Sequence, residues 1–169
     1  MQRKSAFVAQ LLQKLLAEYP NVTTELVDPN SFTFAGDGND PEGKDANYTA
    51  VTERADGFLI VVPEYNHSFP GSLKRMLDSE LETYNHKAVA FAGVSSGSWG
   101  GVRAIEALVT ATRETGLVAL SIDMQFPHVQ ELFSESGELL NEKYRERPKR
   151  MFEELLWMTR LLKEGREQA

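Results

Sequence analysis

Three short apolar segments set the framework of the predicted fold. They cover residues 58–62, 88–92 and 117–122. Segments of this length without polar alternation are typical of strands that are buried on both faces of a sheet. A further strand is predicted at residues 22–27, where apolar and polar positions alternate. Residues 126–129 are predicted to be no more than extended.

Apolar residues at helical spacing occupy the stretches between these strands. The stretches are residues 7–19, 49–55, 73–81 and 102–112. A last helix is predicted over residues 141–164. Because Pro148 inside it would remove a hydrogen bond at a cost of about 3 kcal/mol, we expect a kink there or a helix that starts near Arg147. Alternating strands and helices predict a single α/β domain over residues 1–169, with a parallel sheet and helices on both faces.

Composition and charge narrow the class of protein. The 169 residues carry a net charge of -7, which argues against a general binder of nucleic acid or of acidic membranes. The absence of cysteine removes disulfides, thiolate nucleophiles and sulfur-ligated metals, and it fits a cytoplasmic protein. No apolar segment approaches the roughly 18 residues of a membrane span, and the N-terminal residues lack the apolar core of a secretory signal.

Polar side chains gather directly after two of the predicted strands. The segment 63–71 carries ring, carboxyl, amide, imidazole and hydroxyl groups, and the segment 93–101 consists mainly of glycine and serine. In an open parallel sheet, ligands bind in the crevice beyond the carboxyl ends of the strands. Glycine lets the main chain approach a ring closely. These two loops therefore predict a site for a flat ring with a polar edge, such as a flavin.

Other kinds of chemistry find little support in the sequence. His86 and His128 are isolated, and no HExxH or similar spacing is present, so no metal site is predicted. Ser95, Ser96 and Ser98 do not lie in a Gly-x-Ser-x-Gly motif, which argues against a hydrolase with a nucleophile elbow. Two side chains have two possible interpretations each. Trp99 either shields the ring or makes ordinary packing contacts, and Glu64 is either a solvated carboxylate or has a direct role in the site.

Several motifs give the chain a resemblance to a known family. They are Pro63-Glu64-Tyr65-Asn66-His67-Ser68, Pro70-Gly71-x-Leu73-Lys74, Gly97-x-x-Gly100-Gly101-x-Arg103-Ala104 and Phe126-Pro127-x-Val129-Gln130. Together they resemble the NADPH-dependent FMN reductases of flavodoxin-like fold, and the resemblance extends from Arg3 to about Leu162. The Pro-Glu-Tyr-Asn motif after a buried strand is specific, whereas glycine-rich loops alone are not. Arg103 itself is interpreted as a surface or subunit-contact residue.

The resemblance implies a set of cofactor-binding residues. They are Arg3 and Ser5 at the FMN phosphate, Pro63, Glu64, Tyr65, Asn66, His67 and Ser68 along the ring, and Ser95, Ser96, Gly97, Gly100 and Gly101 on its other side. No catalytic side chain and no metal is implied, because the chemistry takes place at N5 of FMN. The implied activity is ping-pong transfer of electrons from NADPH or NADH to a quinone, flavin, azo compound or similar acceptor.

The family resemblance also implies a homodimer or homotetramer. Residues 69–81 are the first candidate for the subunit contact. The second is the segment 28–47, which contains a long polar stretch rich in glycine, aspartate and asparagine. Loops of this length are uncommon inside compact domains and are often functional.

The chain departs from the family at its start, because the first strand and the front of the phosphate loop are missing. In the flavodoxin-like order 2-1-3-4-5 that strand is central. Three explanations stay open: the sequence begins too late, the sheet closes up without the strand, or another chain covers the gap. The alternative function is therefore a flavodoxin-like binding or scaffold protein that holds FMN weakly or not at all.

Overall fold

The computed structural model describes residues 3–168 and contains a four-stranded, fully parallel sheet. Its strands are β1 (Gly57–Pro63), β2 (Ala88–Val94), β3 (Val118–Ala119) and β4 (Met124–Phe126). On one side β2 pairs with β1 along its whole length, and on the other it pairs first with β3 and then with β4. The predicted parallel α/β architecture is confirmed.

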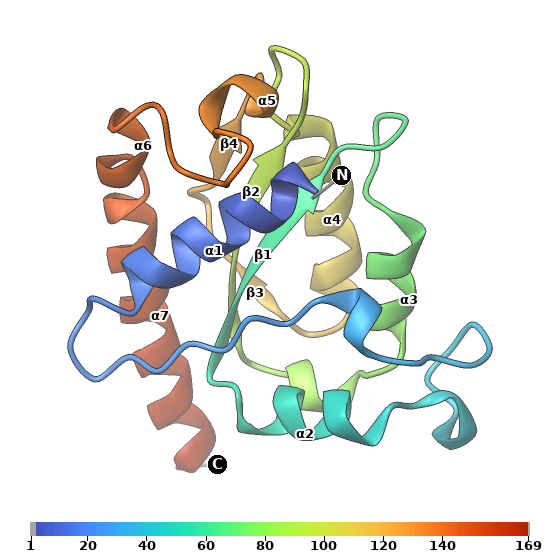
Figure 1. The fold of residues 1–169 in the computed structure, drawn as a ribbon. Helices are drawn as coiled ribbons and strands as arrows, with labels where there is room; N and C mark the ends of the chain where they lie inside the picture. Colours follow the sequence, from blue (N-terminus) through green and yellow to red (C-terminus); the bar gives the residue numbers. More distant parts are fainter. Residues whose placement is uncertain (1–2, 169) are drawn as a thin grey trace.

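Helices cover both faces of this sheet (Figure 1). They are α1 (Lys4–Leu16), α2 (Ala46–Arg54), α3 (Gly71–Asp78), α4 (Val102–Glu114), α5 (Val129–Leu132), α6 (Lys143–Glu146) and α7 (Lys149–Glu167), with 3-10 turns at Pro29–Ser31, Pro41–Gly43 and Glu82–Tyr84. Buried residues of α1 and α7 share one apolar cluster, and those of α3 and α4 share another. No helix in the described part of the chain is long and apolar enough to cross a membrane.

The side chains of β2 divide the core into these two clusters. Ala88, Ala90 and Ala92 face α1 and α7, whereas Val89 and Phe91 face α3 and α4. Successive side chains of a strand point to opposite faces, so an apolar run of this kind buries both faces at once. Small alanines on one face let α1 and α7 pack closely on the sheet.

The predicted strand at residues 22–27 is wrong. These residues are extended but pair with no strand, and a groove of about 1620 Å³ lies along them and along β1. A strand needs a neighbour for its backbone hydrogen bonds, and the groove separates this segment from the edge of β1. Within the described residues, the sheet has therefore not closed up between this segment and β1.

The same gap explains why β1 is less buried than predicted. Only Val62 is fully buried in β1, and the other residues are half-buried, whereas every residue of β2 is buried. One long edge of β1 has no strand partner among residues 3–168. In Figure 1, α1 and the extended segment that follows it pass in front of β1 without pairing with it.

The predicted strand at residues 117–122 is only partly right. Two residues form β3, after which the chain leaves the sheet and returns as β4, where Met124 and Phe126 are buried. Polar Ser121 and Asp123 fall between the two strands, and Asp123 accepts a hydrogen bond from the side chain of Gln125. Of the segment 126–129, predicted to be no more than extended, only Phe126 belongs to β4, and the chain turns at Pro127 and His128 before α5 begins at Val129.

The helix boundaries follow local chemistry. Pro148 directly precedes α7, where a missing N–H costs nothing, so the helix start expected near Arg147 is confirmed within two residues. Helix α2 begins three residues earlier than predicted, at Ala46. The Asp45 carboxylate accepts the N–H groups of Asn47 at 3.0 Å and Tyr48 at 3.3 Å, which is an N-cap.

Candidate functional site

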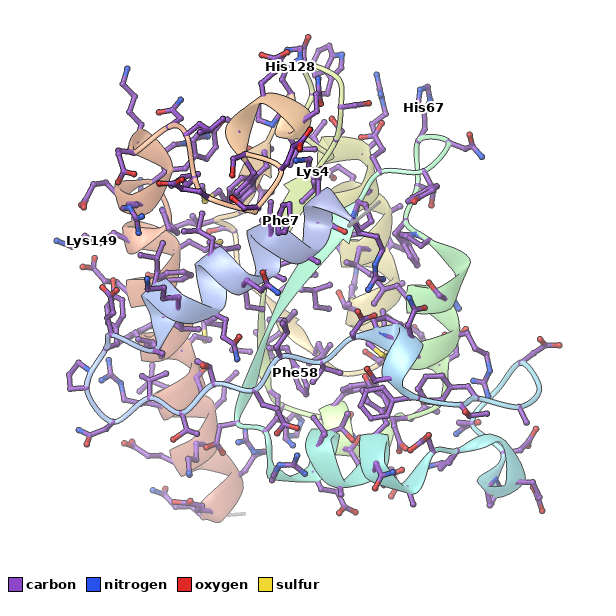
Figure 2. All side chains as sticks on the ribbon, viewed as in Figure 1. Lys4, Phe7, Phe58, His67, His128 and Lys149 are labelled. Atoms are coloured by element: carbon purple, nitrogen blue, oxygen red, sulfur yellow. The ribbon has the colours of Figure 1, made fainter. Side chains whose placement is uncertain are left out.

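The loops after β1 and β2 line one small cavity at the carboxyl end of the sheet. Its volume is about 330 Å³, and it is lined by Glu64, Asn66, His67, Ser95, Ser96, Gly97, Trp99 and Arg103. Figure 2 shows His67 on the first loop and His128, close to the second, at the same end of the molecule. The structure thus brings together six of the predicted site residues, from two loops about thirty positions apart.

The first loop is a tight two-residue turn. The N–H of Tyr65 donates to the carbonyl of Ser68 at 2.8 Å, and Ser68 donates back at 2.9 Å. Asn66 and His67 at the tip have φ angles of 48° and 65°, in the left-handed region. Positive φ at both central positions is the pattern of a type I′ turn, which prefers Asn first. The turn holds the Asn66 and His67 side chains at the mouth of the cavity.

The second loop is braced by the chain that leaves β4. The N–H of Ser95 donates to the Phe126 carbonyl at 3.2 Å, and the Val129 N–H donates to the Ser95 carbonyl at 3.1 Å. His128 donates its N–H to the carbonyl of Gly97, also at 3.2 Å. These bonds give a physical role to the Phe-Pro-x-Val-Gln motif, which holds the rim of the cavity from behind.

The three glycines of the second loop have different roles. A Cβ on Gly97 would meet nothing within 4 Å, so its main chain faces open space beside the cavity. A Cβ on Gly100 would lie 2.6 Å from the Cβ of Gln125, and one on Gly101 would strike the backbone of Gly93 and Val94. Gly100 and Gly101, with φ of 61° and 89°, therefore let the loop pack on the sheet and do not line the cavity.

Sequence reasoning left two residues of the cavity out of the predicted site, Trp99 and Arg103. Arg103 donates from Nη1 to Oε1 of Glu64 at 2.8 Å, and its guanidinium carbon lies 5.7 Å from the centre of the Trp99 ring. The position of Arg103, one turn into the helix that follows a site loop, was the available signal. Trp99 is 66% exposed, so it is not an ordinary core residue.

Arg3 and Ser5 lie outside the small cavity and line the groove along β1. The groove reaches the cavity, since Glu64, Asn66, Ser95 and Ser96 border both. Arg3 forms a salt bridge with Asp28, and the hydrogen bond from its guanidinium lowers the pKa of that carboxyl below the ordinary value.

Three other predicted residues lie away from the small cavity. Pro63 and Tyr65 border the groove along β1, and Ser68 borders neither space. Ser68 instead supplies the backbone bonds that close the first loop. The role that the structure gives to Ser68 is this backbone pairing with Tyr65.

The arrangement fits the flavin expected from the sequence. The cavity lies at the lower end of the range for small-molecule sites and is the right size for part of a ring system. Glu64, one of the lining residues, has a buried oxygen, Oε2, without a hydrogen-bond partner in the described structure. The first turn of α1 has no acidic residue and no side-chain cap, so its N–H groups can receive an anion.

Comparisons with known proteins agree with this arrangement. The sequence profile of the NADPH-dependent FMN reductases matches residues 1–130. An NAD(P)H-dependent FMN reductase of Pseudomonas aeruginosa is 33% identical over 118 residues, covering 63% of this chain and 61% of that protein. A quinone reductase of Pseudomonas putida is 37% identical over 103 residues, covering 54% of this chain and 52% of the other. An NADPH azoreductase of a Bacillus species is 34% identical over 59 residues, about a third of each chain.

The fold also has a solved counterpart. The flavoenzyme NAD(P)H:(acceptor) oxidoreductase FerB of Paracoccus denitrificans superposes with a TM-score of 0.67 and 23% identity, covering 97% of this chain and 93% of that one. This likeness shows a flavodoxin-like fold. The chain spans 61% or less of the length of the curated relatives that it matches. On its sequence profile, which covers more than half of the residues, the chain belongs to the NADPH-dependent FMN reductase family.

Proposed function

We propose that this protein is an NAD(P)H-dependent, FMN-containing oxidoreductase. The observation that carries the proposal is the convergence of Asn66 and His67 from one loop with Ser95, Ser96 and Gly97 from the other on a single cavity. Both loops follow parallel strands, at the end of the sheet where such folds bind ligands. Bound FMN would supply the hydride-accepting chemistry, so no acid, base or nucleophile is required of the chain.

The chain's own residues would hold and orient the ring. The fixed turn at Asn66 and His67 and the braced main chain at Ser95 to Gly97 would approach its edges. The open side of the cavity would stay free for the two substrates. NAD(P)H and the electron acceptor would occupy it one after the other, as in a ping-pong mechanism. Relatives named quinone reductase and NADPH azoreductase support quinones and azo compounds as acceptors, beside free flavin. NAD(P)H is an intracellular metabolite, which supports the cytoplasm as the compartment.

The absorbance spectrum of the freshly purified protein tests this proposal. We expect the two visible flavin bands, and oxidation of NADPH or NADH when a quinone is added. The rates of oxidation of NADPH and of NADH, measured under the same conditions, would establish which reductant is preferred. A colourless protein that neither takes up added FMN nor oxidises either nucleotide would refute the proposal.

One observation favours the alternative of a binding or scaffold protein without reductase activity. The groove along β1 lies where the family resemblance implies a central strand, and Arg3, which lines this groove, forms a salt bridge with Asp28. A phosphate bound there would lack several backbone donors, each worth about 1 kcal/mol net and more to a charged group. The same spectrum separates the two functions, since the scaffold protein would stay colourless with added FMN.

We also propose that the protein forms a homodimer or homotetramer through residues 69–81 and 28–47. Arg75 of α3 joins the two segments, donating to the carbonyls of Gly38 at 2.9 Å and Gly43 at 3.1 Å. The two segments therefore present one continuous surface, on which Leu81 is 42% exposed. Size-exclusion chromatography with light scattering should give a mass of at least two chains. A monomer that still reduces quinone would refute the proposed contact.

A further inference from the structure

Two stretches of backbone line the groove along β1 without strand partners on that side. Residues 22–27 are extended and form no backbone hydrogen bond in the described structure, and β1 pairs only with β2. Figure 1 shows the extended segment passing in front of β1 without joining the sheet. An extended chain directs its N–H and C=O groups to both of its sides. The groove therefore offers hydrogen-bonding groups from two walls.

The side chains along the groove are apolar on both faces of the sheet. Leu59 and Val61 of β1 pack against the cluster that contains α1 and α7, whereas Phe58 and Ile60 pack against the cluster that contains α3 and α4. All four are half-buried and line the groove. The segment 22–27 likewise contributes one valine to each cluster. An occupant that extends both clusters needs apolar side chains on alternating sides, which is the pattern of a buried strand.

The size and charge of the groove narrow the class of occupant further. Its volume of about 1620 Å³ exceeds the range of about 300–1,000 Å³ that small-molecule sites occupy. Its lining carries five cationic and five anionic side chains, and three ion pairs join members of this set. The chain as a whole has a net charge of -7, so this balance is local to the groove. A neutral lining with paired charges favours an occupant without charged side chains.

We propose that the groove is a docking site for an extended segment of another protein, which enters as a strand between β1 and residues 22–27. The segment matches the seven residues of β1 in length, about 23 Å, and is apolar on both faces. Main-chain hydrogen bonds hold such a strand, and its side chains give specificity, as in other cases of strand addition to a sheet edge. The inference goes beyond the proposed function and does not depend on the flavin.

A different protein fits this description better than a second copy of the chain. Outside its helices and strands, the described part of the chain, residues 3–168, has no run of four apolar residues. The apolar strands β1 and β2 are already paired with each other. A second copy would therefore have to unfold its own sheet to donate a suitable strand.

A peptide copied from β2 is the probe for this site. The sequence Ala88–Val94 already pairs with the opposite edge of β1 and is buried on both faces. The peptide carries two lysines at each end for solubility and a fluorescein label, and anisotropy should show saturable binding to the wild type. A matched peptide with N-methyl groups on alternate residues keeps every side chain but loses the N–H groups of one edge. It should bind at least about tenfold more weakly.

Two leucines provide a matched pair of variants that locates the peptide. Leu26 lines the groove and Leu161 on α7 does not, and each is 45% exposed. Leu26→Asp places a charge beside the apolar side chains of the strand, so the peptide should bind at least about tenfold more weakly. Leu161→Asp should bind the peptide as the wild type does. Circular dichroism of both variants shows whether each is folded.

Hydrogen exchange with and without the peptide shows whether a strand forms. Because the N–H of Glu64 donates toward β2, the N–H groups of Leu59 and Val61 face the groove. The peptide should slow the exchange of these two N–H groups in the wild type. This measurement and the comparison of the two peptides need no variant, so they stand even if Leu26→Asp fails to fold.

Four outcomes would overturn the inference and leave the proposed function untouched. They are the absence of saturable binding, equal binding of the plain and N-methylated peptides, unchanged exchange at Leu59 and Val61 when the peptide is bound, and protection of both positions before any peptide is added. In the last case, protection that weakens on dilution would assign the groove to a second copy of the chain. Protection at every concentration would assign it to the chain itself.

Discussion

The N–H of Tyr65 and the carbonyl of Ser68 lie 2.8 Å apart, and the reciprocal bond is 2.9 Å long. This pair closes the turn that presents Asn66 to the cavity with a φ of 48°. The residue type is therefore explained twice, because asparagine tolerates the left-handed region better than most residues and also carries an amide that can bind a ring.

Two substitutions of Asn66 separate these roles. Asn66→Gly keeps the turn and removes the amide, so we expect FMN affinity to fall about 3- to 10-fold, the value of one hydrogen bond, with little change in stability. Asn66→Ala also strains the turn, by about 1 kcal/mol, and should lower both affinity and stability. Flavin titration and urea unfolding measure the two effects.

Asn21 provides the control for Asn66, since it has a φ of 60° just beyond α1 and does not line the cavity. Asn21→Ala should lower the free energy of unfolding without lowering FMN affinity. Full flavin occupancy in both Asn66 variants would place the ring elsewhere.

Gly101 is predicted to be intolerant of any side chain. Its φ of 89° is strained for other residues, and a Cβ would strike the backbone of the adjoining strand. Gly101→Ala should therefore lower the free energy of unfolding by more than about 2 kcal/mol, or Tm by several degrees. Gly97→Ala, where a Cβ meets open space, should stay within about 1 kcal/mol of the wild type. Equal stabilities of the two variants in thermal melts would contradict the assigned packing role of Gly101.

The sequence was sufficient for those parts of the fold that depend on local pattern. The apolar residues of β2 and those of the helical stripe on α1 lie in the core, as their patterns predict. The segment 22–27 shows the limit of such reasoning. Its alternation is that of a strand, but strand formation depends on a partner, and the partner expected between it and β1 is missing. Pairing is a property of the whole sheet and cannot be read from one segment.

The site was predictable to the extent that its residues follow strands directly. Asn66 and Ser95 lie one to three positions beyond β1 and β2, and topology alone brings such positions together. Arg103 lies inside a helix and enters the site through its ion pair with Glu64, which depends on how α4 packs on the sheet. The roles of Gly100 and Gly101 likewise required coordinates, because the backbones they touch are distant in sequence.

Asp45 should make the stability of α2 depend on pH. Hydrogen bonds from the N–H groups of Thr33, Tyr48 and Asn47 lower its pKa below the ordinary value, the bond from Thr33 most. Because the pKa is lower in the folded than in the unfolded state, the stabilisation is present above the unfolded value and is lost as pH falls through the folded value. Asp45→Ala should therefore cost about 0.5–2 kcal/mol at pH 7, and progressively less below about pH 4.

Two further variants check this assignment by urea unfolding across the pH range. Asp45→Asn keeps a capping group without a charge, so its stability should vary less between pH 5 and pH 3 than that of the wild type. Asp40 precedes a 3-10 turn without capping it, so Asp40→Ala should be close to neutral. The difference in stability between the wild type and Asp45→Ala should change with pH. A difference that stays constant would show that the Asp45 carboxylate does not cause the pH dependence.

Hydrogen exchange should reveal the open edge of β1. The N–H of Glu64 donates to Val94 of β2, and alternate residues of a parallel strand face the same neighbour, so Ile60 and Val62 also donate toward β2. The N–H groups of Leu59 and Val61 then face the groove. We expect these two to exchange at least about tenfold faster than those of Ile60 and Val62, which serve as controls within the same strand.

The dependence of this exchange on protein concentration shows whether the groove is open to water in solution or covered by another chain. A groove open to water gives fast exchange at Leu59 and Val61 at every protein concentration. Another chain lying along β1 would protect both positions, and the protection would weaken on dilution as the complex dissociates. Equal and concentration-independent protection of all four positions would mean that the chain itself covers the edge. The measurement therefore distinguishes an uncovered edge of β1, whose residues are half-buried along the groove, from an edge that a partner chain covers.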